Sequence, residues 1–115
     1  MTAREVGEGL VALCSEGKFD EASLKYYAAD IVSVEAEGED RETRGMDAIK
    51  AKIDWWNNTF ELHGQKVEGP WVNEPQFLIK LEVDITNKET GERQLMKEHC
   101  LYTVENGKIV HERFF

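Results

Sequence analysis

The sequence predicts an α+β domain in which three N-terminal helices pack against a strongly curved sheet that is mixed but mostly antiparallel. Apolar residues recur at helical spacing in the first half of the chain, whereas residues 77–86 alternate between apolar and polar, as a half-buried strand does. Asn106-Gly107 then separates two β-rich runs, which is the strongest short signal for a β-hairpin. Helices followed by strands indicate α+β rather than alternating α/β architecture, and 115 residues are enough for a single domain over 1–115.

The first two helices are marked by residues that stabilise helix ends. Thr2 with Glu5 three positions later is a capping-box signature, so the first helix is expected to start there and to end at Gly17. Asp20 is a candidate N-cap for a second helix, which would run through Tyr27.

A strand and a third helix are expected next. The β-branched run at 31–36 predicts a short strand followed by a polar loop, and Thr43-Arg44-Gly45 predicts a second short strand. Asp47 is a candidate N-cap for the third helix. The apolar stripe of this helix consists of Ile49, Ile53, Trp56 and Phe60.

The second half of the chain predicts an antiparallel meander. Its strands are expected at 65–72, 77–86, 92–104 and 108–115, with a turn at 88–91. Gly69-Pro70 interrupts the first of them, which favours a bend, a bulge or an edge position. Sheet twist would curl such a meander over the helices and enclose a cavity, although a flatter α+β sandwich fits the same pattern.

The C-terminal hairpin predicts one wall of that cavity. A two-residue turn at Asn106-Gly107 would pair Val104 with Ile109, Tyr102 with His111, Cys100 with Arg113 and Glu98 with Phe115. One face would then carry Glu98, Tyr102, His111 and Arg113 among apolar neighbours. The opposite face is hardly less apolar, and if that face points inward the acidic residue in the cavity is Glu112 instead.

Composition excludes several classes of function. A formal net charge of −9 without any basic run argues against nucleic-acid binding, and no apolar run is long enough for a membrane span. Cys14 and Cys100 lie far apart and lack metal-ligand spacing, so we expect reduced, buried thiols in a cytoplasmic protein with no metal site. No phosphate loop or nucleotide fingerprint is present, so we expect no cofactor.

Several short motifs resemble one family when their order and spacing are taken together. They are Gly-Lys-Phe-Asp at 17–20, Tyr27-Ala-Ala-Asp30 with the following strand, Arg44-Gly45 with Ala48-Ile49, Glu98 through Tyr102-Thr-Val, and Asn106-Gly107-Lys-Ile-Val ending in Phe114-Phe115. The chain resembles the SnoaL-like branch of the nuclear transport factor two-like superfamily, which also contains ketosteroid isomerase. The resemblance implies a cone-shaped α+β barrel, a pocket between helices and sheet, and a homodimer formed through the sheet.

The resemblance transfers the isomerase site only in part. It places Glu35 where the isomerases keep their catalytic carboxylate base, but Leu10 where they keep a catalytic tyrosine. Their second acid falls near His99 or Cys100, so ketosteroid isomerisation is not implied. SnoaL-type polyketide cyclases use an acid–base Asp or His in the same cavity, a part that Glu98, His111 or Glu35 could play here.

The candidate site therefore has two groups of residues. Glu35, Glu98 and His111 are the candidate catalytic residues, since a carboxylate near an apolar cavity has a raised pKa that suits a general base. The candidate substrate-binding residues are Tyr27, Trp56, Phe60, Trp71, Tyr102 and Arg113. In the structural alternative, Glu35 points to water, Glu98 pairs with Arg113 or His111, and the aromatic residues belong to the core.

Two functions remain open from the sequence. The first is cofactor-free acid–base catalysis, such as isomerisation, cyclisation or dehydration, on a small apolar or amphipathic molecule. The second is a non-catalytic ligand-binding or dimerisation module. An enzyme should present a carboxylate or imidazole, without a protein counter-charge, to a cavity of roughly 300 Å³ or more.

Overall fold

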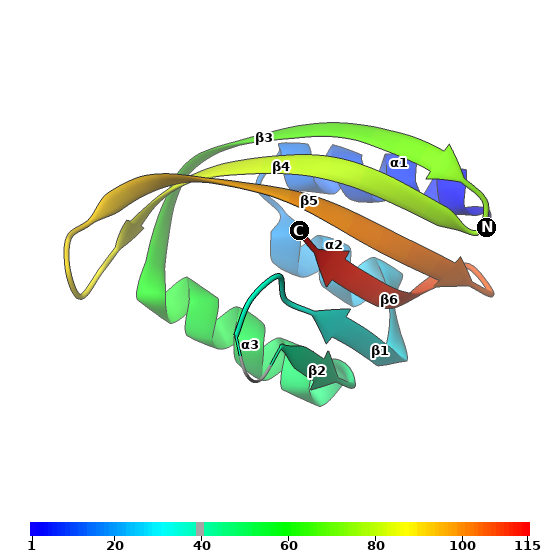
Figure 1. The fold of residues 1–115 in the computed structure, drawn as a ribbon, viewed down its shortest axis with the longest axis horizontal. Coiled ribbons are helices and arrows are strands. Elements are labelled where there is room, and N and C mark those ends of the chain that lie inside the picture. Colours follow the sequence, from blue (N-terminus) through cyan, green and yellow to red (C-terminus); the bar gives the residue numbers. More distant parts are fainter. Residues whose placement is uncertain (39–40) are drawn as a thin grey trace.

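The computed structural model describes residues 1–38 and 41–115, so positions 39 and 40 of the predicted polar loop lie outside the described residues. In chain order, the elements are α1 (Ala3–Ser15), α2 (Phe19–Tyr26), β1 (Tyr27–Val34), β2 (Glu42–Arg44), α3 (Met46–Thr59), β3 (Phe60–Asn73), β4 (Gln76–Asn87), β5 (Arg93–Glu105) and β6 (Lys108–Phe114) (Figure 1). The described strands form one sheet in the order β2-β1-β6-β5-β4-β3. The β1–β6 pair is parallel and the other pairs are antiparallel.

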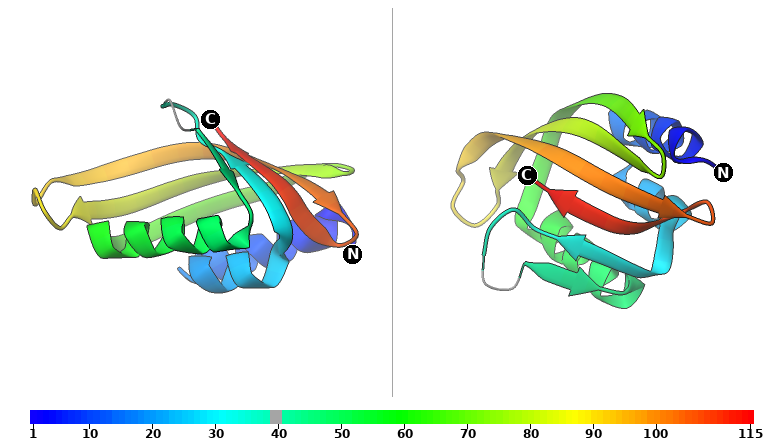
Figure 2. Two further views of the ribbon diagram at one scale, coloured as in Figure 1. Left: turned by 90° about the horizontal axis from the view of Figure 1, so that it is seen from below. Right: turned by 45° about the vertical axis from the view of Figure 1, so that its right-hand side comes forward.

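The predicted α+β class is confirmed. The three helices lie on one side of the curved sheet, and the other side of the sheet is left uncovered (Figure 2). The sheet is not closed, because β2 and β3 are its two edges. The sheet is therefore an open, curved sheet with the helices on its concave side, and it does not form a complete barrel.

Helix α1 follows the sequence signals closely. The Thr2 hydroxyl accepts a hydrogen bond from the Glu5 backbone N–H at 3.2 Å, and the Glu5 carboxylate accepts one from the Thr2 backbone N–H at 3.0 Å, so the capping box is present. Gly17, just past the helix, has φ 77°, a conformation that residues with a Cβ rarely adopt. Val6 and Leu10 on the inner face of α1 are buried against the sheet.

The N-caps predicted for α2 and α3 each lie two residues after the observed ones. Their N-caps are Lys18 and Gly45, and neither makes a side-chain capping bond. Asp20 and Asp47 lie instead in the first turn of each helix, where a negative charge interacts favourably with the helix dipole. Tyr27 is not helical and is the first residue of β1.

The meander of β3, β4 and β5 has the expected properties. Strand β3 is an edge strand, and its register with β4 breaks between Glu68 and Trp71, at the predicted Gly69-Pro70 interruption. In β4 the odd-numbered residues from Phe77 to Ile85 face the helices, and the even-numbered ones face outward. The stacked rings of Phe77 and Tyr102, 4.8 Å apart between centroids, join β4 to β5 inside the core.

The register predicted for the C-terminal hairpin was wrong beyond its first pair. Asn106 and Gly107 both have positive φ, 51° and 74°, and Val104 pairs with Ile109 as predicted. A bulge then shifts the register, so the following pairs are Thr103 with His111, Tyr102 with Glu112, Leu101 with Arg113 and Cys100 with Phe114. A shift of one residue moves every later side chain to the other face of the sheet. Glu112 and Phe114 therefore face the helices, whereas His111 and Arg113 face outward.

Both cysteines are free and buried in the described structure, as expected. Among the described residues, no helix is long and apolar enough to cross a membrane.

We expect Phe77→Ala to lower the free energy of unfolding by about 3–5 kcal/mol, because Phe77 is 1% exposed at the centre of the core. The matched substitution Phe115→Ala should cost less than about 1 kcal/mol, since Phe115 is 57% exposed. Urea unfolding followed by circular dichroism measures both. Equal losses in the two variants would contradict the assignment of the inner face.

Candidate functional site

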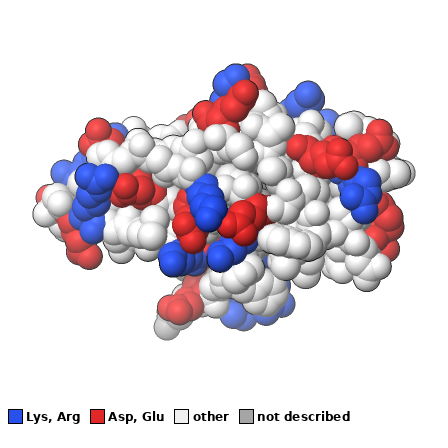
Figure 3. Space-filling model, turned by 90° about the horizontal axis from the view of Figure 1, so that it is seen from above, with Lys and Arg blue, Asp and Glu red and all other residues white. Residues whose placement is uncertain are grey.

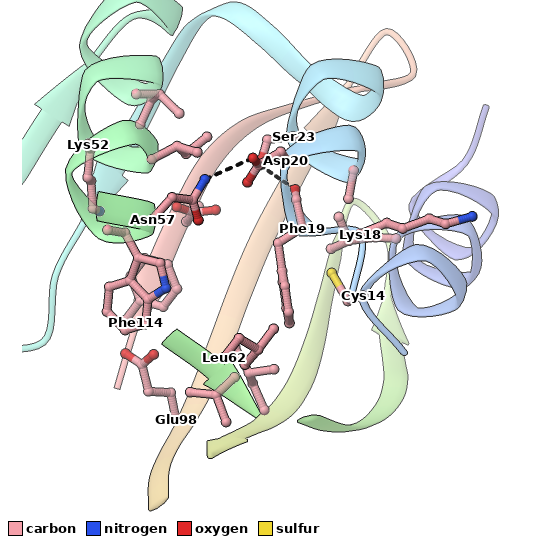
Figure 4. A pocket seen from close by; sticks show the side chains of 18 of the residues that line it. Cys14, Lys18, Phe19, Asp20, Ser23, Lys52, Asn57, Leu62, Glu98 and Phe114 are labelled. Atoms are coloured by element: carbon pink, nitrogen blue, oxygen red, sulfur yellow. Dashed lines mark hydrogen bonds between the residues drawn. The ribbon is translucent and has the colours of Figure 1, made fainter. Parts of the chain in front are cut away.

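A pocket with a volume of about 680 Å³ lies between the helices and the concave face of the sheet (Figure 4). All three helices and strands from both halves of the sheet contribute to its walls. Its apolar lining includes Leu10, Phe19, Ile53, Phe60, Leu81 and Phe114. The volume exceeds the roughly 300 Å³ that a small organic ligand requires.

The junction between α3 and β3 forms an aromatic end of the pocket. The Trp56 and Phe60 ring centroids lie 4.4 Å apart, and Trp55 packs edge-on against Phe60 at 6.0 Å. Trp55 is 59% exposed and so lies at the mouth. Asn57 on α3 donates a 2.9 Å hydrogen bond to the Asp20 carboxylate on α2, which joins the two helices across the pocket (Figure 4).

Glu112 is the most deeply buried acid of the pocket, at 3% exposed. The Tyr27 hydroxyl donates to one of its carboxylate oxygens, and the Ser33 hydroxyl donates to the other at 2.7 Å. Burial raises the pKa of Glu112, and these two hydrogen bonds oppose that rise. Although Tyr27 as a residue is only half-buried, its hydroxyl lies inside, where burial and the Glu112 charge raise its pKa well above the ordinary value. Both oxygens of Glu112 are thus already satisfied by the protein.

Lys52 on α3 is the cation inside the pocket. Its ammonium group forms an ion pair with Glu35, which lies just after β1, and is 3.5 Å from the Ser33 hydroxyl. The same ammonium lies 5.3 Å from the centroid of the Phe114 ring. Burial lowers the pKa of Lys52, while the charges of Glu112 and Glu98 raise it. Glu35 therefore faces the pocket, but with a counter-charge already in place.

Strand β1 distinguishes the two interpretations of Glu35. As a candidate catalytic residue Glu35 was expected in the cavity, and in the structural alternative it pointed to water. In the structure, Ile31 and Ser33 are fully buried, and Glu35 continues their side of the strand. This face of β1 is the inner one because β1 pairs in parallel with β6, beside Glu112.

Glu98 on β5 is a half-buried carboxylate of the pocket wall without a hydrogen-bonding or ion-pair partner among the described residues, whereas Glu21, which also lacks one, is exposed. Its half-buried side chain extends toward Phe114 (Figure 4), and no side-chain hydrogen bond or ion pair involves it within residues 1–38 and 41–115. Burial raises the pKa of Glu98, Lys52 opposes this, and Glu112 adds to it. A carboxylate with a raised pKa beside an apolar cavity can exchange protons with a bound molecule near neutral pH.

A second hollow of about 470 Å³ lies on the other side of Glu98. It is lined by Glu35, Ala36, Glu37, Trp56, Met96, Lys97, Glu98 and Phe115. Glu35, Trp56, Met96 and Glu98 line both hollows, so the side chains of these residues separate them.

The structure brings some of the predicted residues together and excludes others. The pocket is lined by Glu35, Glu98, Tyr27, Trp56, Phe60 and Tyr102, as expected. His111 and Arg113 do not line it, because the bulge turns them outward. Trp71 does not line it either, since it pairs with Leu78 on the outer face and is 53% exposed.

Sequence reasoning did not single out Lys52 and Ser33. Lys52 lies three positions after Ile49 and four before Trp56, so the helical periodicity of α3 could have placed it on the inner stripe. Ser33 shares its face with Ile31, two positions earlier in the strand. In the part of the chain that the structure describes, no group of three or more His, Cys, Asp or Glu is arranged to hold a metal ion.

Comparison with known proteins agrees with this fold. A family model described as a SnoaL-like domain matches residues 1–115. A crystal structure from Mesorhizobium loti, provisionally named a SnoaL-like polyketide cyclase, is 45% identical, covers 100% of this chain and 99% of that one, and superposes with a TM-score of 0.94.

More distant structures share the fold. A Xanthomonas campestris protein of unknown function with a cystatin-like fold is 20% identical over 100% of this chain and 90% of that one, with a TM-score of 0.78. A Pseudomonas putida protein, provisionally named a polyketide cyclase, is 18% identical over 100% of this chain and 91% of that one, with a TM-score of 0.75. A search of curated proteins found no match.

We expect Glu98→Gln to raise the melting temperature at neutral pH. Because burial raises the pKa of Glu98, the folded protein binds a proton more tightly than the unfolded chain, and stability falls as the pH rises from 4.5 through the folded-state pKa. A neutral glutamine removes this penalty, so the advantage should be largest at pH values above the folded-state pKa of Glu98 and shrink as the pH falls toward 4.5.

Scanning fluorimetry at a series of pH values measures this effect. Glu105→Gln, an exposed substitution on the same strand, is the matched control and should show no such gain. A lower melting temperature for Glu98→Gln at neutral pH would mean that the folded protein stabilises the ionised carboxylate.

Proposed function

The chain belongs to the SnoaL-like domain family, and we propose that it binds a small apolar or amphipathic molecule in the pocket and catalyses acid–base chemistry on it without a cofactor. Isomerisation, cyclisation and dehydration are the reaction types that such a site can serve. The observation that carries the proposal is Glu98, a carboxylate on the wall of a 680 Å³ pocket that makes no hydrogen bond or ion pair among the described residues.

Glu98 acts as the general base in this proposal. Glu35 is neutralised by Lys52, and both oxygens of Glu112 accept hydrogen bonds from Tyr27 and Ser33, so neither is as free to accept a proton. The raised pKa of Glu98 makes its carboxylate a stronger base than a solvated glutamate.

Negative charge that develops on the substrate would be stabilised from α3 and β5. The Lys52 ammonium, held by Glu35, lines the same pocket as Glu98, and its charge lowers the pKa of Glu98. The Tyr102 side chain also lines the pocket and offers a hydroxyl donor. Donors held in place before the reaction stabilise an oxyanion without reorganisation, especially where water is excluded.

The Mesorhizobium loti relative makes cyclisation the first reaction to test. That protein is provisionally named a polyketide cyclase and is similar to this chain over its whole length. An intramolecular carbon–carbon bond formation of this class begins with removal of a proton beside a carbonyl group, which is the step assigned here to Glu98.

A non-catalytic ligand-binding module is the second candidate function. Two contacts favour it: the Glu112 carboxylate is saturated by Tyr27 and Ser33, and Lys52 is paired with Glu35. In that case these groups only order the pocket wall, and Glu98 recognises a ligand without reacting with it.

We also propose that the protein forms a homodimer through the outer face of its sheet. Trp71 and Leu78 form an apolar strip there, next to the ion pairs Lys66–Glu68 at 3.1 Å and Lys97–Glu82 at 3.9 Å. The view onto the β3 edge of the sheet shows acidic and basic side chains interspersed, with no extended basic patch in that view (Figure 3). On the outer face itself, an apolar strip beside paired charges suits a second protein copy better than nucleic acid.

Proton removal by Glu98 can be tested before the natural substrate is known. Wild-type protein in D₂O should accelerate hydrogen–deuterium exchange at the carbon atoms beside the carbonyl of a bicyclic ketone such as 2-tetralone. Proton NMR measures the rate of this exchange. Glu98→Gln should lower the protein-dependent rate roughly 100-fold or more, because the base is lost.

Glu105→Gln serves as the control and should exchange at the wild-type rate. If wild-type protein binds the ketone but Glu98→Gln exchanges it equally fast, Glu98 is not the base. If the ketone binds without any exchange, the binding module is favoured.

Trp71→Lys is expected to shift the oligomeric state from dimer to monomer, because a lysine in the apolar strip would be buried without a partner. Light scattering coupled to size-exclusion chromatography measures the mass. Leu24→Lys, at a position 61% exposed on α2, is the control and should leave the dimer intact. A wild-type protein that is monomeric at high micromolar concentration would exclude this interface.

A further inference from the structure

We propose that the ligand of this pocket is a cation, with an apolar ring-containing body and a protonated amine that binds beside Glu98. The inference rests on the proposed function only in so far as the pocket binds a small organic molecule. It adds the charge of that molecule, which neither the fold nor the family specifies.

Acidic side chains outnumber basic ones around the pocket. The acids that line it are Asp20, Glu21, Glu35, Glu98 and Glu112, and the bases are Lys18 and Lys52. Five acids and two bases give the lining a formal net charge of −3, which favours positive ligands over negative ones.

Both lysines are already paired. Lys18 lies at the exposed rim and is 3.1 Å from the Glu16 carboxylate, while Lys52 is held by Glu35. An anionic ligand would have to displace Glu35 from Lys52, and this would leave the Glu35 carboxylate partly buried and unpaired. A partly buried, unpaired carboxylate is unfavourable, so carboxylates and phosphates should bind weakly.

Glu98 is the half-buried acid that a bound cation can reach, since Glu21 is an exposed residue of α2. Glu112 is shielded by Tyr27 and Ser33, and Asp20 accepts a hydrogen bond from Asn57 at the mouth. Glu98 has no such partner in the described residues. Its side chain is half-buried, and this burial is the main cause of its raised pKa. A ligand ammonium would replace the water that this carboxylate has lost.

The aromatic walls around Glu98 are also suited to a cation. The Lys52 ammonium already lies 5.3 Å from the Phe114 ring centroid, so this wall accommodates a positive charge. Trp56 lines both hollows next to Glu98 and offers the ring type that attracts cations most strongly. The second hollow leaves room for substituents on the amine.

A bound cation would keep Glu98 ionised but would also make it a weaker base, so this inference concerns recognition of the ligand and not the catalytic role of Glu98. An opposite charge a few ångströms away lowers the pKa of a carboxyl group and so keeps it ionised. The charged groups around Glu98 are Lys52 from α3, Glu112 from β6 and Glu35 after β1. Glu37 and Lys97 also line the second hollow, and Lys97 is paired with Glu82 on the outer face. The ligand amine would thus add to the effect of Lys52.

Three probes of the same shape and different charge test this inference. They are 2-naphthylmethylamine, which is a cation at pH 7, the neutral 2-naphthylmethanol, and the anion 2-naphthoate. Calorimetric titration of the full chain gives each affinity, and amide chemical shifts of ¹⁵N-labelled protein establish whether the probe binds in the pocket. We expect the amine to bind at least tenfold tighter than the alcohol, and the carboxylate to bind more weakly than the alcohol.

Variants at Glu98 show whether its charge causes the preference. Glu98→Gln should reduce the affinity for the amine to that for the alcohol and leave alcohol binding unchanged, which also shows that the variant is folded. Glu98→Asp should keep a preference for the amine, and Glu105→Gln should behave as wild type. Added salt should weaken amine binding and leave alcohol binding unchanged.

The outcomes separate this inference from the proposed function. If the alcohol binds in the pocket as tightly as the amine, or the carboxylate binds as tightly as either, the ligand is not a cation, while small-molecule binding stands. If the amine preference survives Glu98→Gln, the inference is overturned because another group recognises the amine. If none of the three probes binds in the pocket, both this inference and the proposed function are contradicted.

Discussion

The site depends on one extra residue in β6. Val110 has no partner in β5, because Ile109 pairs with Val104 and His111 pairs with Thr103. This bulge turns Glu112 toward the helices and Arg113 toward the outer face. With a regular hairpin, the guanidinium of Arg113 would enter the hollow and provide a counter-charge for Glu98. The bulge therefore decides both which acid is buried and which acid is left without a partner.

Burying Glu112 imposes a second requirement on the fold. A fully buried carboxylate is unfavourable unless its oxygens accept hydrogen bonds, and Tyr27 and Ser33 supply them from β1. The parallel pairing of β1 with β6 places these donors beside Glu112, and Lys52 from α3 completes the network with Glu35. The network joins both strands and a helix into one ordered wall. Glu98 lies next to this wall but outside it.

Local sequence patterns predicted the elements well and the site only in part. The capping box at Thr2, the alternation in β4 and the turn at Asn106-Gly107 each depend on residues close together in the chain, and all three are present. Glu98 lines the pocket as expected because β5 pairs with β4 without a register break. Trp71 was misplaced because the register of β3 breaks at Gly69-Pro70, which sequence reasoning located without deciding the face.

The sequence by itself determined the α+β class and the order of the elements, because hydrophobic periodicity and turn residues depend only on residues close together in the chain. It also determined the excess of acidic over basic residues, which is a property of the composition. Only the tertiary structure decided which face of β6 points inward. Strand β6 must pair with β5 on one side and β1 on the other, and a single register has to satisfy both while packing against the helices. The pairing of Lys52 with Glu35, from elements far apart in the chain, follows from that packing and has no local signature.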